Sequence, residues 1–165
     1  RTMEVFLREA SPGERALRLA LDHFDRILTQ RAFQRLMQQE MLRLHRGEQS
    51  EWPILVKRVF APTMAMFESS IRNGIATGEL IDAEWLQMVL AAVGGNVMYF
   101  MSSPVWRLIL PYDPLAPEAV KTRRTLMVEF LGKAIFKDRE RGAELAAKVL
   151  ADSPMPDFVE FGKLR

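Results

Sequence analysis

Apolar residues recur along this chain at the three- and four-residue spacing of amphipathic helices, and they nowhere form the alternating runs that predict strands. The first complete helix is predicted over residues 12–30, because Ser11 and Pro12 are typical of a helix start and Glu14 has the spacing of a capping box. Its stripe is Leu17, Leu21, Phe24 and Leu28, flanked by Ala20 and Ile27. The pattern predicts an all-α protein, an antiparallel helical bundle of about six to seven helices.

The same periodicity predicts helices over residues 31–45, 52–77, 82–103, 118–137 and 139–150. Phe33, Leu36, Met37, Met41 and Leu44 form the stripe of the 31–45 helix, with Glu40 on or beside it. Pro62 should kink the 52–77 helix, and Gly78 should end it in a left-handed conformation. Pro104 and residues 110–117 are expected to end the 82–103 helix and to link it to the next one.

Residues 82–103 are the most informative segment, because apolar residues cover nearly the whole circumference of a helix that Asp82 should cap. A helix needs one apolar stripe to join its own core, and this one carries two. Trp85, Met88, Ala92, Asn96 and Tyr99 share one face, and Leu86, Leu90, Val93, Val97 and Met101 share another. The second stripe needs a partner, which could be another subunit, a ligand or both.

Gly94 and Gly95 lie at the centre of this helix, where each glycine costs about 1 kcal/mol relative to alanine. Their presence indicates that a neighbouring helix or a ligand comes close to the backbone there. Asn96 should be buried beside them, so it needs a hydrogen bond to a neighbouring helix, a water or a ligand.

Composition excludes several classes of function. The 23 Lys and Arg are interleaved with 21 Asp and Glu, which argues against a nucleic-acid-binding face within these residues. The chain has no cysteine, so disulfides and thiolate chemistry are excluded. No membrane span is expected, since no run of apolar residues is long enough and Asp82, Glu84, Gln87 and Asn96 would be stranded in lipid.

The residues give no support for catalysis, and we expect neither a metal nor a cofactor. Only two histidines occur, His23 and His45, and neither has a second ligand at helical spacing. A surface or half-buried histidine is the preferred interpretation of His23. No phosphate loop, dinucleotide fingerprint or nucleophile elbow is present.

The ten methionines favour an adaptable apolar site, although gap-filling in a core remains the simpler interpretation of each one. A ligand pocket also needs a few polar groups among apolar walls. Glu40, Trp85, Asn96 and Tyr99 are the candidates for that role.

The order of these elements resembles the C-terminal regulatory domain of TetR-type (tetracycline-repressor-like) transcriptional regulators. The resemblance rests on the 12–30 helix, FQRLMQQEML at 33–42, FAPTMAMFESSIRNGIATGEL at 60–80, the glycine-containing helix that reaches Tyr99, the proline-rich linker and FLGKAIF at 130–136. It covers most of residues 1–137.

The resemblance implies one C-terminal regulatory domain over residues 1–165 of a cytoplasmic protein. The family places a helix-turn-helix domain before this region, and nothing in these residues matches it, so DNA would be bound only through that missing N-terminal domain. Residues 1–10 would then be the end of the connecting helix, and the chain would be a fragment.

The resemblance also implies a homodimer, in which the 82–103 and 118–137 helices pair with their copies in a four-helix bundle. A small hydrophobic effector would bind between the helices and shift the spacing of the DNA-binding domains. The implied pocket walls are Met37, Glu40, Met41, Phe60, Met64, Phe67, Trp85, Met88, Asn96 and Tyr99. The implied dimer interface is Leu90, Val93, Gly94, Val97, Met101, Met127, Phe130, Leu131 and Ala134.

Two hypotheses therefore remain. In the preferred one, the chain is the effector-sensing and dimerisation domain of a transcriptional repressor, and it has no enzymatic activity. In the alternative, it is a helical homodimerisation or interaction module with a filled core and no effector. Which stripe of the 82–103 helix faces the partner, and which ligand binds, stay open at this point.

Overall fold

The computed structural model describes residues 9–49 and 52–158 of the chain. Within these ranges the protein is all-α, with seven helices and no strand beyond one isolated antiparallel bridge between Leu80 and Phe136. The predicted fold class is confirmed in its helical content, and dimerisation is not shown. The predicted helix end at residues 1–10 falls almost wholly outside the described residues.

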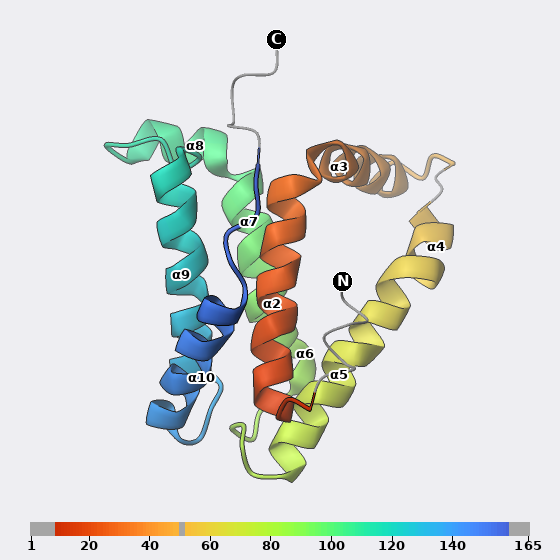
Figure 1. Ribbon diagram of the computed structural model, residues 1–165. Coiled ribbons are helices and arrows are strands. Elements are labelled where there is room, and N and C mark those ends of the chain that lie inside the picture. Colours follow the sequence, from red (N-terminus) through yellow and green to blue (C-terminus); the bar gives the residue numbers. More distant parts are fainter. Residues whose placement is uncertain (1–8, 50–51, 159–165) are drawn as a thin grey trace.

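The helix α2 (Pro12–Thr29) lies at the centre of the bundle, against α5, α7, α9 and α10 (Figure 1). Ser11 caps it as predicted, because its hydroxyl accepts a hydrogen bond from the Glu14 N–H at 3.1 Å. Every residue of the predicted stripe is buried: Leu17, Ala20, Leu21, Phe24, Ile27 and Leu28.

The predicted 52–77 helix is continuous and consists of α4 (Trp52–Leu55), η1 (Val56–Phe60) and α5 (Ala61–Ala76). The turn before Pro62 is π-helical, and the Ala61 N–H bonds the Val56 carbonyl five residues back. This wider turn is a known way for a helix to accommodate an interior irregularity. Gly78 has φ +77° and ends the helix as predicted.

The two-striped helix consists of α6 (Trp85–Val89), η2 (Leu90–Gly94) and α7 (Gly95–Met101). Its predicted cap was wrong: Glu84 caps it, because its carboxylate accepts a hydrogen bond from the Leu86 N–H at 2.7 Å. Pro104 does not simply end this helix. It lies in the first turn of a further helix, α8 (Ser103–Ile109), where the missing N–H does no harm.

Among the described residues no single helix is long and apolar enough to cross a membrane. One bent pair, Trp85–Met101 with Ser103–Ile109, meets the length and composition criteria together, and its two parts are bent by 69°.

The helices α9 (Pro117–Ala134) and α10 (Arg139–Asp152) follow the predicted ranges closely. Each of the two helices has a glycine at their point of contact, Gly132 on α9 and Gly142 on α10. A Cβ on Gly142 would lie 1.9 Å from the Gly132 carbonyl oxygen, and a Cβ on Gly132 would lie 2.5 Å from that of Gly142. The two backbones therefore meet without intervening side chains.

The helix α3 (Arg31–His45) differs from its prediction. It extends away from the bundle at the end where α2 terminates (Figure 1). Four residues of its predicted stripe are exposed in the described structure: Phe33, Leu36, Met41 and Leu44. The pattern predicted an amphipathic helix correctly, but the stripe does not join the core that surrounds α2.

Buried charges fasten the other helices to α2. Arg124 on α9 donates from Nε and Nη2 to the two carboxylate oxygens of Asp25 at 2.8 and 2.9 Å, and the two side chains are 6% and 3% exposed. Arg124 Nη2 also donates to the Ser153 carbonyl at 2.9 Å. This one guanidinium therefore joins α2, α9 and the segment that follows α10.

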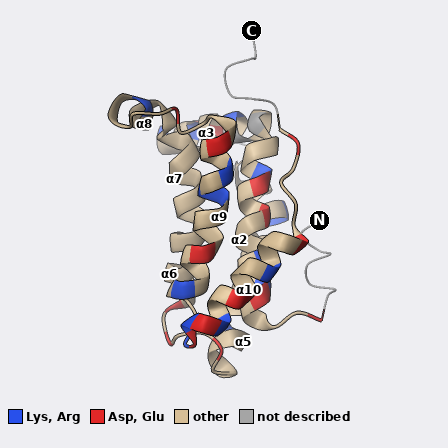
Figure 2. Ribbon diagram, turned by 60° about the vertical axis from the view of Figure 1, so that its left-hand side comes forward, with Lys and Arg blue, Asp and Glu red and all other residues tan. Residues whose placement is uncertain are grey.

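A second group of charges joins α2 to α10, two helices that lie next to each other and carry both acidic and basic residues (Figure 2). The Glu14 carboxylate accepts from Arg18 and from Lys148, each at 2.6 Å. Arg18 also donates to Asp152 at the end of α10.

Removing one member of the buried Asp25–Arg124 pair should destabilise the fold, because the remaining charge would be buried without its partner. We expect Asp25→Asn and Arg124→Met each to lower the free energy of unfolding by about 3–5 kcal/mol in urea titrations. The control is Arg141→Met, which removes an exposed ion pair with Glu144 and should cost about 1 kcal/mol or less. Equal small losses in all three variants would contradict this role of the pair.

Candidate functional site

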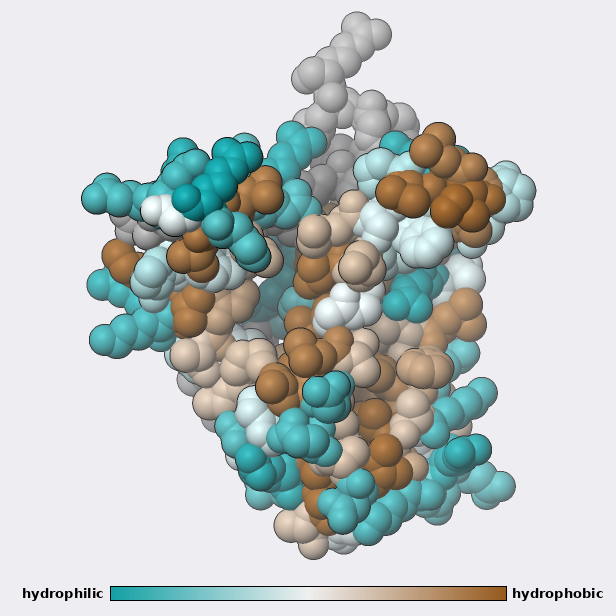
Figure 3. All heavy atoms as spheres, turned by 180° about the vertical axis from the view of Figure 1, so that it is seen from behind, coloured by the Kyte–Doolittle hydropathy of each residue, from teal (hydrophilic) through white to brown (hydrophobic). Residues whose placement is uncertain are grey.

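The two faces of the α6–α7 helix have different environments. Met88, Ala92 and Asn96 are buried in the protomer's own core, whereas Leu86 and Leu90 are exposed. The predicted division of this helix into two faces is therefore present in the structure. Seen from behind in Figure 3, apolar residues gather over the middle of this side of the molecule. The outer apolar face has no neighbour among the described residues.

Asn96 is the most completely buried polar residue of this helix, with 0% of its surface exposed. Its Nδ2 donates to the Ala20 carbonyl of α2 at 3.1 Å. Its Oδ1 is also buried and has no hydrogen-bond partner in the described part of the chain. An unpaired buried acceptor costs about 1–3 kcal/mol, so this oxygen is suited to receive a donor.

Tyr99 lies one turn further along α7 and is half-buried. Its hydroxyl donates to the Pro114 carbonyl, and its ring packs near Phe24 and Phe100 at centroid distances of 6.5 and 5.3 Å. The Arg123 guanidinium lies 5.5 Å from the ring centroid. Burial raises the pKa of Tyr99 to about 12, so the hydroxyl stays protonated and bonded.

Four more of the predicted pocket residues come together where α5 meets α6. Phe67 and Met88 are buried in the core, and Met64 and Trp85 pack against it. The Arg72 guanidinium lies 5.9 Å from the Trp85 ring centroid. The four apolar side chains belong to, or pack against, the same hydrophobic core and form an apolar layer where the two helices meet.

The remaining four predicted pocket residues lie apart from this layer, on α3 and η1. Phe60 packs against Trp52, with ring centroids 5.2 Å apart. Glu40 is buried on α3 and accepts from Arg43 Nη1 at 2.9 Å. Met37 is half-buried and Met41 is exposed. The structure therefore brings six of the ten residues to the bundle and leaves four on the α3 side.

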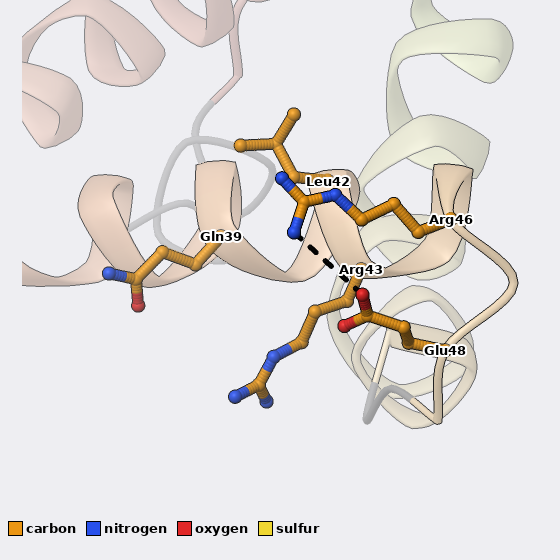
Figure 4. A pocket seen from close by; sticks show the side chains of 5 residues that line it. All are labelled: Gln39, Leu42, Arg43, Arg46 and Glu48. Carbon is orange, nitrogen blue, oxygen red and sulfur yellow. Dashed lines mark ion pairs between the residues drawn. The ribbon is translucent and has the colours of Figure 1, made fainter.

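A surface pocket of about 410 Å³ lies on α3 and the turn that follows it (Figure 4). It is lined by Gln39, Leu42, Arg43, Arg46 and Glu48. Arg46 and Glu48 form an ion pair there at 3.7 Å. Four of these five lining residues are polar or charged, and none of them is among the ten predicted wall residues.

The predicted interface residues divide by face. Phe130 is 65% exposed, Leu90, Met101 and Ala134 are also exposed, and Val93, Gly94 and Val97 are half-buried. Met127 and Leu131 are each only 3% exposed, because they lie on the inner face of α9. A Cβ on Gly94 would meet nothing within 4 Å. The open backbone at Gly94 lies beside the exposed apolar residues.

Sequence reasoning did not single out Asp25 and Arg124, which are 99 positions apart and show no local pattern. It did note His23, which is half-buried as expected, with Nδ1 buried and unpartnered among the described residues. Burial lowers the pKa of His23 to about 4; Asp22 opposes this shift and Arg26 adds to it. No group of three or more His, Asp or Glu side chains in residues 9–49 and 52–158 could hold a metal ion.

The fold and the α6–α7 helix define a class: an all-α domain in which this helix packs its inner face against the protomer's own core and leaves an apolar outer face exposed. Residues 12–131 match the family described as "Tetracyclin repressor-like, C-terminal domain". The match covers well over half of the chain, so the chain belongs to this family, as the resemblance predicted. Its members are non-enzymatic domains of TetR regulators that typically dimerise. No curated protein and no solved structure matches the chain.

Acidification should weaken the fold through His23. Its pKa in the unfolded chain is about 6.5, so between that pH and its lower folded value only the unfolded state binds the proton. Stability is complete above the unfolded pKa and decreases as the pH falls toward the folded one. From about pH 7.5 to about pH 5, the free energy of unfolding of the wild type should fall by about 2 kcal/mol more than that of His23→Gln.

Urea titrations at the two pH values measure this difference. The control is His45→Gln, because His45 is the other histidine and its side chain is exposed. The prediction is wrong if His23→Gln and His45→Gln lose the same stability on acidification.

Proposed function

We propose that the chain is the effector-sensing and dimerisation domain of a cytoplasmic transcriptional repressor. A small hydrophobic effector binds beside α6–α7 and changes the DNA affinity of a helix-turn-helix domain that precedes these residues in the complete protein. The observation that carries this proposal is the two-faced α6–α7 helix. Its inner face bears the unpaired Asn96 Oδ1, and its outer face bears exposed Leu86 and Leu90.

The dimer part of the proposal rests on two outer faces. The outer face of α6–α7 carries Leu86, Leu90 and Gly94, and that of α9 carries Leu126 and Phe130. Large exposed apolar patches on a protein are typical of interaction sites. A two-fold axis would bury the same patch on both copies. The bare backbone at Gly94 would let a partner helix approach closely. Met127 and Leu131 would support the interface from inside.

The effector part rests on the inner face. Met64, Phe67, Trp85 and Met88 supply an apolar layer of adaptable side chains, and Asn96 supplies one free acceptor. Apolar walls with few polar groups are typical of small-molecule sites. An effector with a single N–H or O–H donor fits this arrangement. Because α6–α7 carries both faces, an effector that displaces it from α2 would also change the dimer geometry.

The interaction module without an effector is the second candidate. It is favoured by the close burial of Phe67 and Met88, which pack with the protomer's own core residues. The two candidates share the dimer and differ only in whether the inner face accepts a ligand.

Charge on the outer face of α9 should prevent dimerisation. We expect the wild type to sediment as a dimer at micromolar concentration and Phe130→Glu to sediment as a monomer, because two buried carboxylates would face each other across the axis. Ala147→Glu places the same charge on the exposed side of α10 and should stay dimeric. Circular dichroism checks that each variant is folded. A monomeric wild type would contradict the proposed dimer.

Ligand response should depend on the free oxygen of Asn96. We expect hydrophobic compounds with one donor, such as indole, to raise the melting temperature of the wild type more than isosteric compounds without one, such as indene. In Asn96→Leu this difference should disappear, while Gln87→Leu, an exposed position on the same helix, should keep it. If no donor compound stabilises the wild type preferentially, the proposed role of Asn96 is wrong.

A further inference from the structure

A second apolar surface lies on α8 and the turn after it, residues 103–113, which we name the α8 arm. Eleven large hydrophobic side chains are exposed between residues 86 and 130, and five of them lie on this arm. They are Val105, Trp106, Leu108, Ile109 and Tyr112. Leu108 is 88% exposed, the highest value among the large hydrophobic residues that the structure describes. None of these five belongs to the predicted pocket or interface.

Short-range hydrogen bonds order the α8 arm locally, so its exposed side chains do not belong to a loose loop. Arg107 donates from Nε and Nη2 to the two carboxylate oxygens of Asp113, each at 2.9 Å. Asp113 Oδ1 also accepts from the Leu115 N–H at 2.9 Å. At its base, the Ser103 hydroxyl donates to the Phe100 carbonyl at 2.9 Å. Exposure of an ordered apolar surface to water is unfavourable, so burying this surface against a partner would be stabilising.

The α8 arm directly follows the α6–α7 helix along the chain. The helix bends by 69° between its two parts, and the arm extends outward past α7 and α9 at that end of the bundle (Figure 2). Met98 and Met101 are exposed and lie between Leu90 and Val105 in sequence. In Figure 3, apolar residues cover both the middle of the face and the upper corner where α8 lies.

We infer that the α8 arm packs against a second copy of this chain, across the same two-fold axis; this inference rests on the proposed dimer. Each copy would extend its arm over the other, because an isologous contact occurs twice. The arm adds five exposed large hydrophobic residues to the proposed contact between the outer faces of α6–α7 and α9.

The number of exposed hydrophobic side chains supports a second copy of the chain as the partner of the α8 arm. A standard interface buries about 800 Å² and involves about 20–30 residues on each partner. The outer faces of α6–α7 and α9 supply six large exposed hydrophobic residues, and the α8 arm brings the total to eleven. The arm therefore contributes nearly half of the apolar anchors available for a stable dimer.

Charge argues against a lipid surface as the occupant. Segments that lie on membranes are rich in Lys and Arg on their polar side. The α8 arm has one basic residue, Arg107, and one acidic residue, Asp113, and these two pair with each other. A neutral apolar arm fits the apolar outer face of another copy.

The experiment compares the dimer dissociation constants of the wild type, Leu108→Glu and Phe130→Glu by sedimentation. We expect Leu108→Glu to raise the dissociation constant at least about tenfold, equal to about 1.4 kcal/mol. Since Leu108 makes little contact within its own protomer, the variant should fold normally, which circular dichroism checks. Ala147→Glu is the matched control for added charge.

Thiol protection gives an independent measurement, because the chain has no cysteine and one introduced thiol reacts alone. Leu108→Cys should react with a maleimide more slowly in the dimer than in the Phe130→Glu background. Ala151→Cys, exposed on α10, should react equally in both.

Each outcome separates the arm from the rest of the interface. If Phe130→Glu breaks the dimer while Leu108→Glu leaves its dissociation constant unchanged and Leu108→Cys is unprotected, the arm inference is overturned and the proposed dimer stands. If Leu108→Glu weakens the dimer and Phe130→Glu does not, the arm inference stands and the proposed contact on α9 is wrong. A monomeric wild type overturns both.

Lipid vesicles test the other occupant. Flotation with phosphatidylglycerol and phosphatidylcholine vesicles should recover no more wild type than Leu108→Glu. Binding that Leu108→Glu abolishes, with an unchanged dimer dissociation constant, would assign the arm to a membrane and overturn the inference.

Discussion

The structure depends on the burial of α2. This helix carries apolar residues on one side and the charged residues Glu14, Arg18 and Asp25 on others, and all of them are buried. Buried charges are tolerated only when they are paired, so α9 and α10 must supply Arg124 and Lys148. Enclosing α2 uses one face of each surrounding helix. The opposite faces are then left to determine what the domain binds.

Those outer faces are unequal, and this inequality connects the fold to the proposed function. The outer side of α10 carries charged residues such as Arg141 and Glu144. The outer sides of α6–α7 and α9 carry Leu90 and Phe130 instead. The same helix that contacts α2 through Asn96 therefore also forms the apolar exterior. A ligand on one side and a partner on the other would act on a single rigid element, which is the physical basis proposed for coupling the two.

Much of the fold and of the two-faced α6–α7 helix could be predicted from the sequence, because helical periodicity indicates which residues share a face. It predicted α2, α9, α10 and the two faces of α6–α7. It could not predict α8, since a proline suits both the end of one helix and the first turn of another. Nor could it show that Met127 is buried while Phe130, three residues further along α9, is exposed. Periodicity defines faces, and long-range contacts decide which face is inside. The Asp25–Arg124 pair has no local signal for the same reason.

The α3 helix shows that a correctly predicted amphipathic helix need not join the core. Its apolar stripe is present, but the stripe does not pack against the core of the bundle.

The central claim is that the outer face of α6–α7 lies against a second copy of the chain. Pulsed electron resonance between spin labels tests it most directly, because a chain without cysteine can be labelled at one chosen position. Labels at Gln87→Cys on α6 and at Ala147→Cys on α10 occupy exposed positions on different helices. The account predicts an intermolecular distance at position 87 that is clearly shorter than the one at position 147. A longer distance at position 87, or none at all, would contradict it.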